Sequence, residues 1–227
     1  MCRMEIKPIA TVNSVFESRF GTPRQPGIVA DAEAVLTFLP PYNDATALRG
    51  LEDVSHIWVI FGFHAIATEQ WRPTVRPPRL GGNRRLGVFS TRSPFRPNGL
   101  GLSVVRLREV LHQPTVSLRL SGVDLMDDTP IYDVKPYLPE IDSHPNAIPP
   151  LGFEKPAEPL AVFWAPGLKA SITPVLARLV EQTVAADPRP AYHRQRADQQ
   201  YGMTLTGHEV QWRITNAGAE IMAITPL

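Results

Sequence analysis

Cysteine is almost absent from this chain, since Cys2 is the only one among 227 residues. A single thiol excludes an intrachain disulfide and a cysteine-based zinc cluster. Long apolar runs are missing as well, because the longest, residues 57–63, is far below the roughly 20 residues that cross a bilayer. The chain begins without an apolar run of signal-peptide length. We therefore expect a cytoplasmic protein.

Acidic residues are missing from one long segment, residues 71–108. Its cations are all arginine: Arg72, Arg76, Arg79, Arg84, Arg85, Arg92, Arg96, Arg106 and Arg108. The rest of the chain then carries a net charge of −8, because the whole chain has +1. Arginine makes bidentate contacts with phosphate and carboxylate that lysine does not reproduce. This Arg-rich window predicts a polyanionic partner, and a solvated face balanced by acids elsewhere is the alternative.

Several sequence motifs of common enzyme classes are also lacking. The chain has no GxGxxG after a strand-like run and no GxxxxGK[ST], HExxH, CxxC or GxSxG. These absences argue against dinucleotide-dependent dehydrogenases, P-loop hydrolases, zinc proteases and serine hydrolases.

Strand-like runs dominate the first half of the chain. They are short, bounded by turn residues and not separated by long helical patterns: residues 5–12, 34–38, 55–63, 86–90, 103–111 and 116–122. Twenty-four prolines further disfavour long helices. We predict a mainly β fold in which an antiparallel sheet, closed into a single-sheeted β-barrel, forms a domain over residues 1–145.

A Pro-rich stretch, residues 139–159, separates this part from a different pattern. Residues 171–186 repeat apolar side chains on one helical face: Ile172, Val175, Leu176, Leu179, Val180 and Val184. Pro174 falls in the first turn, and Ser171 is the expected cap. Strand-like runs follow at residues 201–206, 210–214 and 220–224. We predict a small α+β domain over residues 146–227.

Glycine, proline and arginine alternate over residues 76–103. Glycine allows close backbone approach and positive φ, whereas Pro94 and Pro97 stiffen the path that holds Arg92 and Arg96. This composition predicts a ligand-binding loop. An elaborate turn without a ligand is the alternative.

Six acidic residues gather in the segment that follows: Asp124, Asp127, Asp128, Asp133, Glu140 and Asp142. No recognised metal-ligand spacing is present, so we predict no metal site. Two interpretations stay open, an ion-pair network with the Arg-rich window and the edge of a ligand site.

Six runs occur together and in order. They are residues 23–27 (PRQPG), 49–52 (RGLE) with Ser55 and His56, 79–83 (RLGGN), 90–98 (STRSPFRPN), 133–137 (DVKPY) and 187–192 (DPRPAY). On these runs the chain resembles the TsaA-like family of tRNA adenine-N6 methyltransferases over nearly its whole length. The resemblance implies a single-sheeted barrel that binds S-adenosyl-L-methionine, a homodimer, and methylation of threonylcarbamoyl-adenosine beside the anticodon of tRNA, in the threonine tRNA class.

The resemblance also implies which residues bind the cofactor. They are Gln25, Pro26, Gly27, His64, Ala65, Arg92, Leu102, Gly122, Val123, Asp124 and Leu125. Two positions depart from the family pattern. Gly99 stands where proline is common, and Asp128 stands where glycine is common.

Methyl transfer from a sulfonium is an in-line displacement, so no protein nucleophile is expected. An acceptor for the adenine amine is expected, and Asp133, Asp124 or a backbone carbonyl is the candidate. We expect Arg92 to pair with the cofactor carboxylate. RNA phosphates are assigned to Arg84, Arg85 and Arg96, with Arg189, Arg194 and Arg196 extending the footprint on the tRNA anticodon stem-loop.

Two rival functions remain at this stage. One is a non-catalytic RNA-binding β-barrel that has lost the cofactor. The other is a methyltransferase of the same fold that acts on another substrate.

Overall fold

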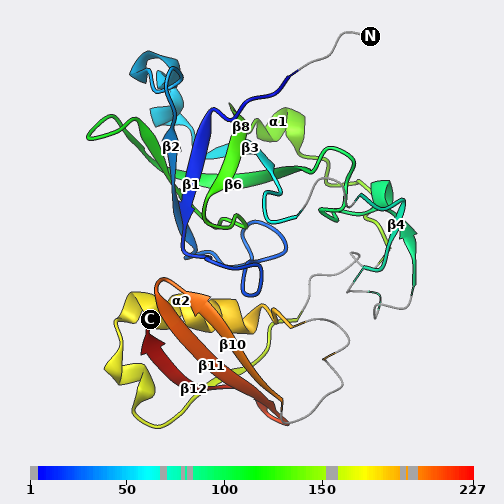
Figure 1. Ribbon diagram of the computed structural model, residues 1–227, viewed down its shortest axis with the longest axis vertical. Helices are drawn as coiled ribbons and strands as arrows, with labels where there is room; N and C mark the ends of the chain where they lie inside the picture. The colour runs from blue at the N-terminus through cyan, green and yellow to red at the C-terminus, as the bar shows by residue number, and fades with distance from the viewer. Residues whose placement is uncertain are drawn as a thin grey trace.

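Two sheet-based parts lie one above the other in the computed structural model of the chain (Figure 1). The structure describes residues 5–66, 71–77, 80, 84–151, 158–189, 193 and 199–227. The upper part is a closed barrel with strand order β1-β2-β7-β6-β3-β8. Its strands are β1 (Ala10–Ser14), β2 (Glu33–Phe38), β3 (His56–Gly62), β6 (Leu100–Leu111), β7 (Ser117–Ser121) and β8 (Thr129–Pro136).

The barrel closes because alternate side chains of its strands share one interior. In β2, Ala34, Leu36 and Phe38 are buried while the residues between them are more exposed. The same period of two places Ile57 and Val59 of β3 inside. All neighbouring strand pairs in the barrel are antiparallel. The predicted mainly β fold with a single-sheeted barrel is therefore confirmed.

Short elements decorate the barrel. They are the 3-10 turns η1 (Ala45–Leu48), η2 (Leu51–Asp53) and η5 (Val88–Ser90), the hairpin strands β4 (Thr74–Val75) and β5 (Leu86–Gly87), and the helix α1 (Pro139–Asp142). Two predicted strands were placed wrongly. The run 5–12 contributes only its end, because β1 begins at Ala10. The run 86–90 is a strand for two residues and then a 3-10 turn, whose buried Val88 anchors it.

Strand β8 was missed by the sequence analysis, which treated residues 124–144 only as an acidic segment. It closes the barrel by pairing with both β1 and β3. Its pattern is weak because Asp133 and Lys135 are exposed on it, so only Thr129 and Ile131 point fully inward. A strand with so few apolar residues is specified by its two partners rather than by its own composition.

The lower part is a four-stranded sheet with order β10-β11-β12-β9 and one long helix. Its elements are β9 (Val162–Trp164), η6 (Leu168–Ser171), α2 (Pro174–Ala185), β10 (Gln200–Leu205), β11 (His208–Thr215) and β12 (Gly218–Pro226). Trp212 is fully buried under Tyr201, with ring centroids 4.6 Å apart. The predicted boundary between residues 145 and 146 lies between α1 and β9 and stays a prediction.

Helix α2 begins later than predicted. Its N-cap is Thr173, whose hydroxyl accepts a hydrogen bond from Leu176 N, so the predicted cap Ser171 belongs to the preceding 3-10 turn. Pro174 occupies the first helical position, as expected. The buried face contains Leu179, Val180 and Val184, whereas Val175 is 66% exposed. Among the described residues, no helix is long and apolar enough to cross a membrane.

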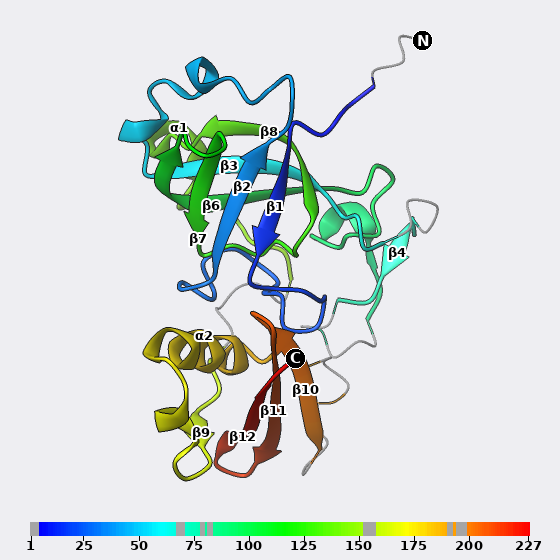
Figure 2. The same cartoon turned by 60° about the vertical axis from the view of Figure 1, so that its left-hand side comes forward.

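Residues 15–32 connect β1 to β2 and lie on the lower part (Figure 2). Backbone and side-chain hydrogen bonds fasten this junction loop: Thr206 N donates to Val15 O at 3.3 Å, Gly207 N to Glu17 Oε1 at 2.6 Å, and Arg24 Nη2 to Arg189 O at 2.8 Å. The buried side chains of the barrel and of the lower sheet form one cluster. The C-terminal part therefore holds the shape of this loop.

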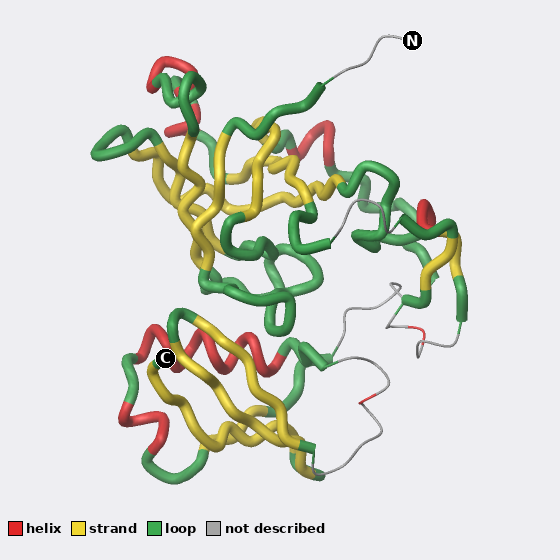
Figure 3. The backbone as a smooth tube through the Cα atoms, in the orientation of Figure 1, coloured by secondary structure: helices red, strands yellow, loops and turns green. Residues whose placement is uncertain are grey.

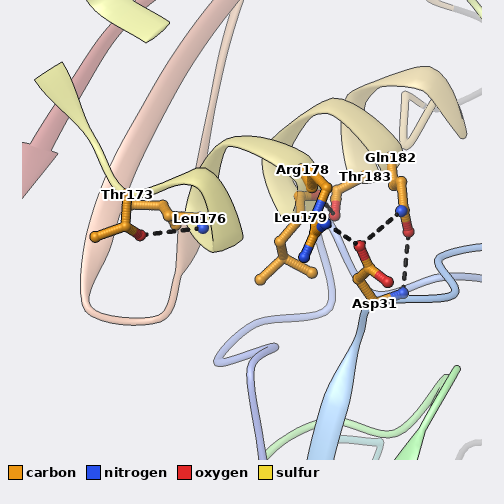
Figure 4. A network of polar contacts seen from close by, with 7 residues as sticks. All are labelled: Asp31, Thr173, Leu176, Arg178, Leu179, Gln182 and Thr183. Atoms are coloured by element: carbon orange, nitrogen blue, oxygen red, sulfur yellow. Dashed lines mark hydrogen bonds and ion pairs between the residues drawn. The ribbon is translucent and has the colours of Figure 1, made fainter. Parts of the chain in front are cut away.

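Asp31 adds a further attachment at the end of the junction loop (Figure 4). Its backbone N–H donates to Gln182 Oε1 at 3.0 Å, and its carboxylate accepts from Gln182 Nε2 at 3.1 Å. Arg178 Nε lies 3.4 Å from the same carboxylate. Gln182 and Arg178 both lie on α2, so this helix fixes the end of the junction loop.

Both departures from the family pattern fall at left-handed backbone. Gly99 has φ +59°, which proline cannot adopt. Asp128 has φ +59°, the conformation for which glycine is suited. The preference for glycine at position 128 thus has a backbone reason.

We expect Asp128→Gly to raise the free energy of unfolding by about 0.5–1 kcal/mol, because a side chain in this conformation is strained. Thermal unfolding of both proteins measures the change. Asp127→Gly is the control and should destabilise, since Asp127 Oδ1 accepts hydrogen bonds from Asn13 Nδ2 and Ser14 N. A less stable Asp128→Gly variant would contradict the expectation.

Candidate functional site

The predicted cofactor residues come from five separate parts of the chain, and the barrel topology brings four of them to one rim, while Arg92 reaches it through Gln25. In a closed antiparallel barrel, neighbouring strands point in opposite directions. The end of β3, the start of β6, the end of β7 and the start of β2 therefore meet at the same rim, where loops gather on the side of the lower part (Figure 3). His64 follows β3, Leu102 lies near the start of β6, and Gly122 follows β7.

Two of these segments are joined directly. Gly27 N donates to Gly122 O at 2.8 Å. Gly122 has φ +69°, and a Cβ at this position would lie 3.5 Å from Gly27 Cα. The junction loop and the segment after β7 consequently form one continuous surface at the rim.

Asp124 continues the line of β7 beside β6. Ser121, the last residue of β7, pairs with Arg106 of β6, and Asp124 follows three residues later beside Ser103. Ser103 Oγ donates to Asp124 Oδ2 at 3.0 Å, and Ser103 is 3% exposed. The other carboxylate oxygen, Oδ1, is buried and accepts no hydrogen bond in the described part of the chain.

The surroundings of Asp124 change its acidity. Burial raises the pKa of Asp124 to about 6, although the hydrogen bond from Ser103, the backbone N–H of Asp124 itself and the nearby charge of Arg92 lower it. A buried carboxylate with one unused oxygen and a raised pKa is a common property of functional sites. Such an oxygen is suited to accept a hydrogen bond from a ligand.

Arg92 reaches the junction loop from the Arg-rich window. Its Nη1 donates to Gln25 Oε1, and the guanidinium is otherwise exposed. Gln25 in turn donates through Nε2 to Arg24 O. The predicted residues Gln25, Pro26 and Arg92 therefore lie together, with a cationic group directed to the rim.

Leu102 and Asp133 lie on the outer surface of the barrel near this rim. Both pair with Ile60 of β3, from opposite sides, so the three residues form one row across β6, β3 and β8. Leu102 is 54% exposed. Asp133 is also exposed, and its Oδ1 accepts from Val134 N at 2.9 Å. His64 and Ala65 are exposed beyond β3.

Asp124 and Asp133 thus differ as candidate acceptors. Asp124 is partly buried beside the inward-facing Ser103, with its Oδ1 inaccessible to solvent, whereas Asp133 is exposed. A desolvated carboxylate interacts more strongly with a bound amine than an exposed one. The geometry favours Asp124.

The arginines predicted to hold RNA fall into two groups. Arg84 and Arg85 are exposed, and Arg85 Nη1 donates to Thr74 Oγ1 at 3.2 Å. Arg96 is half-buried instead, and its Nη1 donates to Thr91 O at 2.8 Å and to Val88 O at 3.4 Å. Arg96 thereby braces its own loop, a role that the composition did not indicate.

The prediction for Arg189 needs correction. Arg189 is 4% exposed, and it pairs with Asp187 through Nε at 2.6 Å and Nη2 at 3.1 Å. A buried guanidinium engaged with a carboxylate cannot reach an RNA phosphate in this conformation. Arg194 and Arg196, predicted with it, lie outside the described residues.

Among the described residues, the acidic segment forms no ion-pair network with the Arg-rich window, although the charge of Arg92 acts on Asp124. Within the described ranges, no salt bridge joins the two segments. The carboxylate of Asp142 instead accepts from Trp58 Nε1 and from Leu138 N, each at 2.9 Å. In the same part of the chain, no three His, Cys, Asp or Glu residues are grouped as metal ligands.

Ser103 was missed as a site residue by the sequence analysis. Its only sequence signal is a polar residue at an inward-facing position of a strand, between Gly101 and Val105. Buried hydroxyls need partners. The partner is visible only once β6 and the segment after β7 are placed side by side.

Comparisons with known proteins match both parts of the chain. The family described as tRNA-methyltransferase O N-terminal domain matches residues 11–143, and the TrmO C-terminal domain matches residues 158–227. The chain belongs to the TrmO family.

Relatives and solved structures of the TrmO family agree with this assignment. An Escherichia coli (strain K12) protein named tRNA (adenine(37)-N6)-methyltransferase is 44% identical over 234 residues, which cover 100% of both chains. The human protein of that name is 41% identical over 147 residues, 64% of this chain and 32% of the human one. A crystal structure of TrmO from Pseudomonas aeruginosa superposes with a TM-score of 0.81 at 33% identity and covers 99% of each chain.

A shorter relative bears on the cofactor. A Methanothermobacter thermautotrophicus protein, "Probable S-adenosyl-L-methionine-binding protein", is 38% identical over 140 residues. The match covers 62% of this chain and 94% of that protein. About two thirds of this chain's length thus corresponds to nearly all of a protein named for the cofactor.

Proposed function

We propose that this chain is a methyltransferase that transfers the methyl group of S-adenosyl-L-methionine to the exocyclic N6 amine of an adenosine beside the tRNA anticodon, the threonylcarbamoyl-adenosine of the threonine tRNA class. The observation that carries the proposal is the arrangement of side chains at the rim. Asp124 offers a buried, unused carboxylate oxygen there, and Arg92 lies against Gln25. Full-length similarity to a bacterial tRNA (adenine(37)-N6)-methyltransferase supports the same reaction.

The side chains at the rim fit the parts of the cofactor. Arg92 supplies a cation for its carboxylate, and bidentate geometry suits arginine for this contact. Gly27 leaves its backbone open to close approach, since nothing lies within 4 Å of the position that a Cβ would occupy. The exposed apolar Leu102 offers a surface for a ring. When bound, S-adenosyl-L-methionine supplies the activated methyl group.

The protein's own task is position and electrostatics. The lone pair of the adenine amine is delocalised into its ring, so an acceptor that holds an amine hydrogen helps to direct the lone pair to the methyl carbon. Asp124 Oδ1 is the acceptor that the geometry supports best, and this carboxylate would take up the proton that the nitrogen loses as it gains the methyl group. No protein nucleophile takes part.

Nucleoside mass spectrometry after incubation with tRNA and S-adenosyl-L-methionine tests the proposal. A mass gain of one methyl group on threonylcarbamoyl-adenosine is expected. Binding of tRNA without any methylated product would support a non-catalytic barrel, and a methylated product elsewhere would support another substrate. We further propose that the protein works in the cytoplasm as a homodimer, which analytical ultracentrifugation tests for the assembly.

Arg92→Lys is expected to weaken cofactor binding by about 10-fold or more while tRNA affinity changes little, because one bidentate contact worth roughly 1.5–3 kcal/mol is lost. Calorimetry with S-adenosyl-L-methionine and filter binding with tRNA measure the two affinities. Arg85→Gln is the control and should show the opposite pattern, with weaker tRNA binding that is also less salt-dependent, because it removes a cation. Equal losses of both affinities in Arg92→Lys would refute the assignment.

A further inference from the structure

The exposed aromatic ring of Phe89 lies close to the proposed site, and Phe89 is not among the predicted cofactor-binding or RNA-binding residues. Phe89 is 74% exposed, although phenylalanine is usually among the more buried residues. It lies in η5, three residues before Arg92. A large apolar side chain that remains in water beside a site is a candidate contact surface.

The backbone under Phe89 is held firmly. Val88, the preceding residue, is buried, and its carbonyl accepts from Thr91 N at 3.1 Å and from Thr91 Oγ1 at 2.8 Å. Arg96 braces the same turn through Val88 O and Thr91 O. The ring is therefore presented by a rigid turn, so little order is lost when something binds to it.

The guanidinium of Arg96 lies 5.8 Å from the centre of the Phe89 ring. Stacked arginine and aromatic groups are the surfaces on which nucleic-acid bases pack in single-stranded RNA. Arg96 thus has a second role besides bracing the turn. It completes an apolar and cationic surface rather than a phosphate clamp.

A hollow of about 350 Å³ opens beside the ring. Its lining is formed on one side by Phe89, Ser90, Thr91 and Arg92, and on the other by Ile148, Pro149 and Pro150. Ile148 is 95% exposed. Two apolar groups, one from each side, therefore face water at a hollow that Arg92 borders.

The charge of the surrounding residues determines which kind of ligand can bind in this hollow. The surrounding window, residues 71–108, contains nine arginines and no acidic residue, so an apolar ligand that brings negative charge along its backbone is favoured there. A single-stranded nucleic acid has this combination, since its bases are flat and apolar on their faces while its backbone is anionic.

We propose that Phe89, backed by Arg96 and faced by Ile148, is a stacking platform for an unpaired nucleobase of the tRNA loop, and that it positions the RNA so that the target adenosine reaches the rim. This inference rests on the proposed function, because it assumes an RNA substrate. Phe89 is a positioning residue and does not take part in methyl transfer.

The test compares the full-length chain with Phe89→Ala and Phe89→Trp. We expect Phe89→Ala to raise the KM for tRNA and the dissociation constant of the tRNA complex by about 5- to 150-fold, which is the range for loss of one stacked base. The dissociation constant for S-adenosyl-L-methionine should not change. Phe89→Trp should restore tRNA binding, because a larger aromatic face still stacks.

Phe163→Ala is the matched control. Phe163 is 46% exposed on β9 in the other part of the molecule, and its replacement should leave tRNA affinity unchanged. Thermal unfolding verifies that each variant is folded. A folded Phe89→Ala variant with wild-type tRNA affinity would overturn the proposal.

Two other results are distinguishable. If the wild-type chain itself methylates no tRNA, the proposed function fails and not merely the platform. If Phe89→Ala instead changes the sedimentation coefficient and leaves the tRNA affinity of the remaining species intact, the ring packs against a second copy of the chain, which also overturns the platform.

Discussion

Asp124→Asn is expected to lower kcat for methyl transfer by about 100-fold or more, since a positioned acceptor contributes about 10²–10⁴ to a proton-linked step. The amide keeps the size of the side chain and removes the negative charge at Oδ1, the buried oxygen with no partner in the described part of the chain. Single-turnover assays with tRNA and saturating S-adenosyl-L-methionine measure the loss.

The pH dependence gives an independent readout of Asp124. Because burial raises its pKa to about 6, the ionised form that accepts a hydrogen bond develops as pH rises through that value. In the wild type, kcat/KM should therefore increase between about pH 5 and 7, and this limb should vanish in Asp124→Asn. Ser103→Ala should move the limb to higher pH, because the Ser103 hydroxyl lowers the pKa.

Asp133→Asn is the comparison that separates the two candidate acceptors. Asp133 is exposed on the outer surface, so its replacement should leave kcat close to wild type. If Asp133→Asn shows the large loss and Asp124→Asn does not, the assignment is reversed.

Whereas kcat/KM should rise with pH, the stability of the wild type should fall as the Asp124 carboxyl ionises. The pKa of the Asp124 carboxyl is higher in the folded than in the unfolded state. Its contribution to the free energy of unfolding is therefore largest at pH values below the unfolded-state pKa, and it is lost as pH rises through the folded-state pKa of about 6. The free energy of unfolding of Asp124→Asn relative to wild type should thus increase by about 2–3 kcal/mol between pH 4 and pH 7. A constant difference would mean that Asp124 is not desolvated.

Arg189→Ala is expected to lower the free energy of unfolding by about 3–5 kcal/mol, because it removes the charged partner of a largely buried carboxylate. The side chains of Arg189 and Asp187 are only 5% and 11% exposed. Chemical denaturation at neutral pH measures the loss. The variant should retain the salt dependence of tRNA binding wherever it is folded.

The double variant Asp187→Asn with Arg189→Met provides the control. Replacing both charges should recover much of the stability lost in Arg189→Ala, since the buried ion pair is then removed as a unit. If Arg189→Ala instead leaves stability unchanged and reduces the salt dependence of tRNA binding by about one phosphate contact, Arg189 binds RNA after all.

The sequence was informative wherever a local pattern and the tertiary environment agreed. The strand-like run 116–122 and the helical spacing over residues 171–186 predicted β7 and α2, because the apolar side chains of both pack on the core. β8 escaped prediction, since its hydrogen bonds to β1 and β3 outweigh a composition rich in polar residues. The sequence identified the arginines that could bind RNA but not their individual roles. Sequence position alone does not distinguish the exposed Arg85 from the buried Arg189.

By itself the sequence determined the fold class, the arginine-rich and acid-free window, and the family, because each depends on residue types and their order along the chain. Tertiary structure alone decided which groups meet: Ser103 with Asp124, Gly27 with Gly122, and Phe89 with Arg96. The physical reason is that acidity and accessibility depend on the neighbours of a group and on its distance from water. Barrel closure sets both by bringing strand ends from distant parts of the chain to one rim.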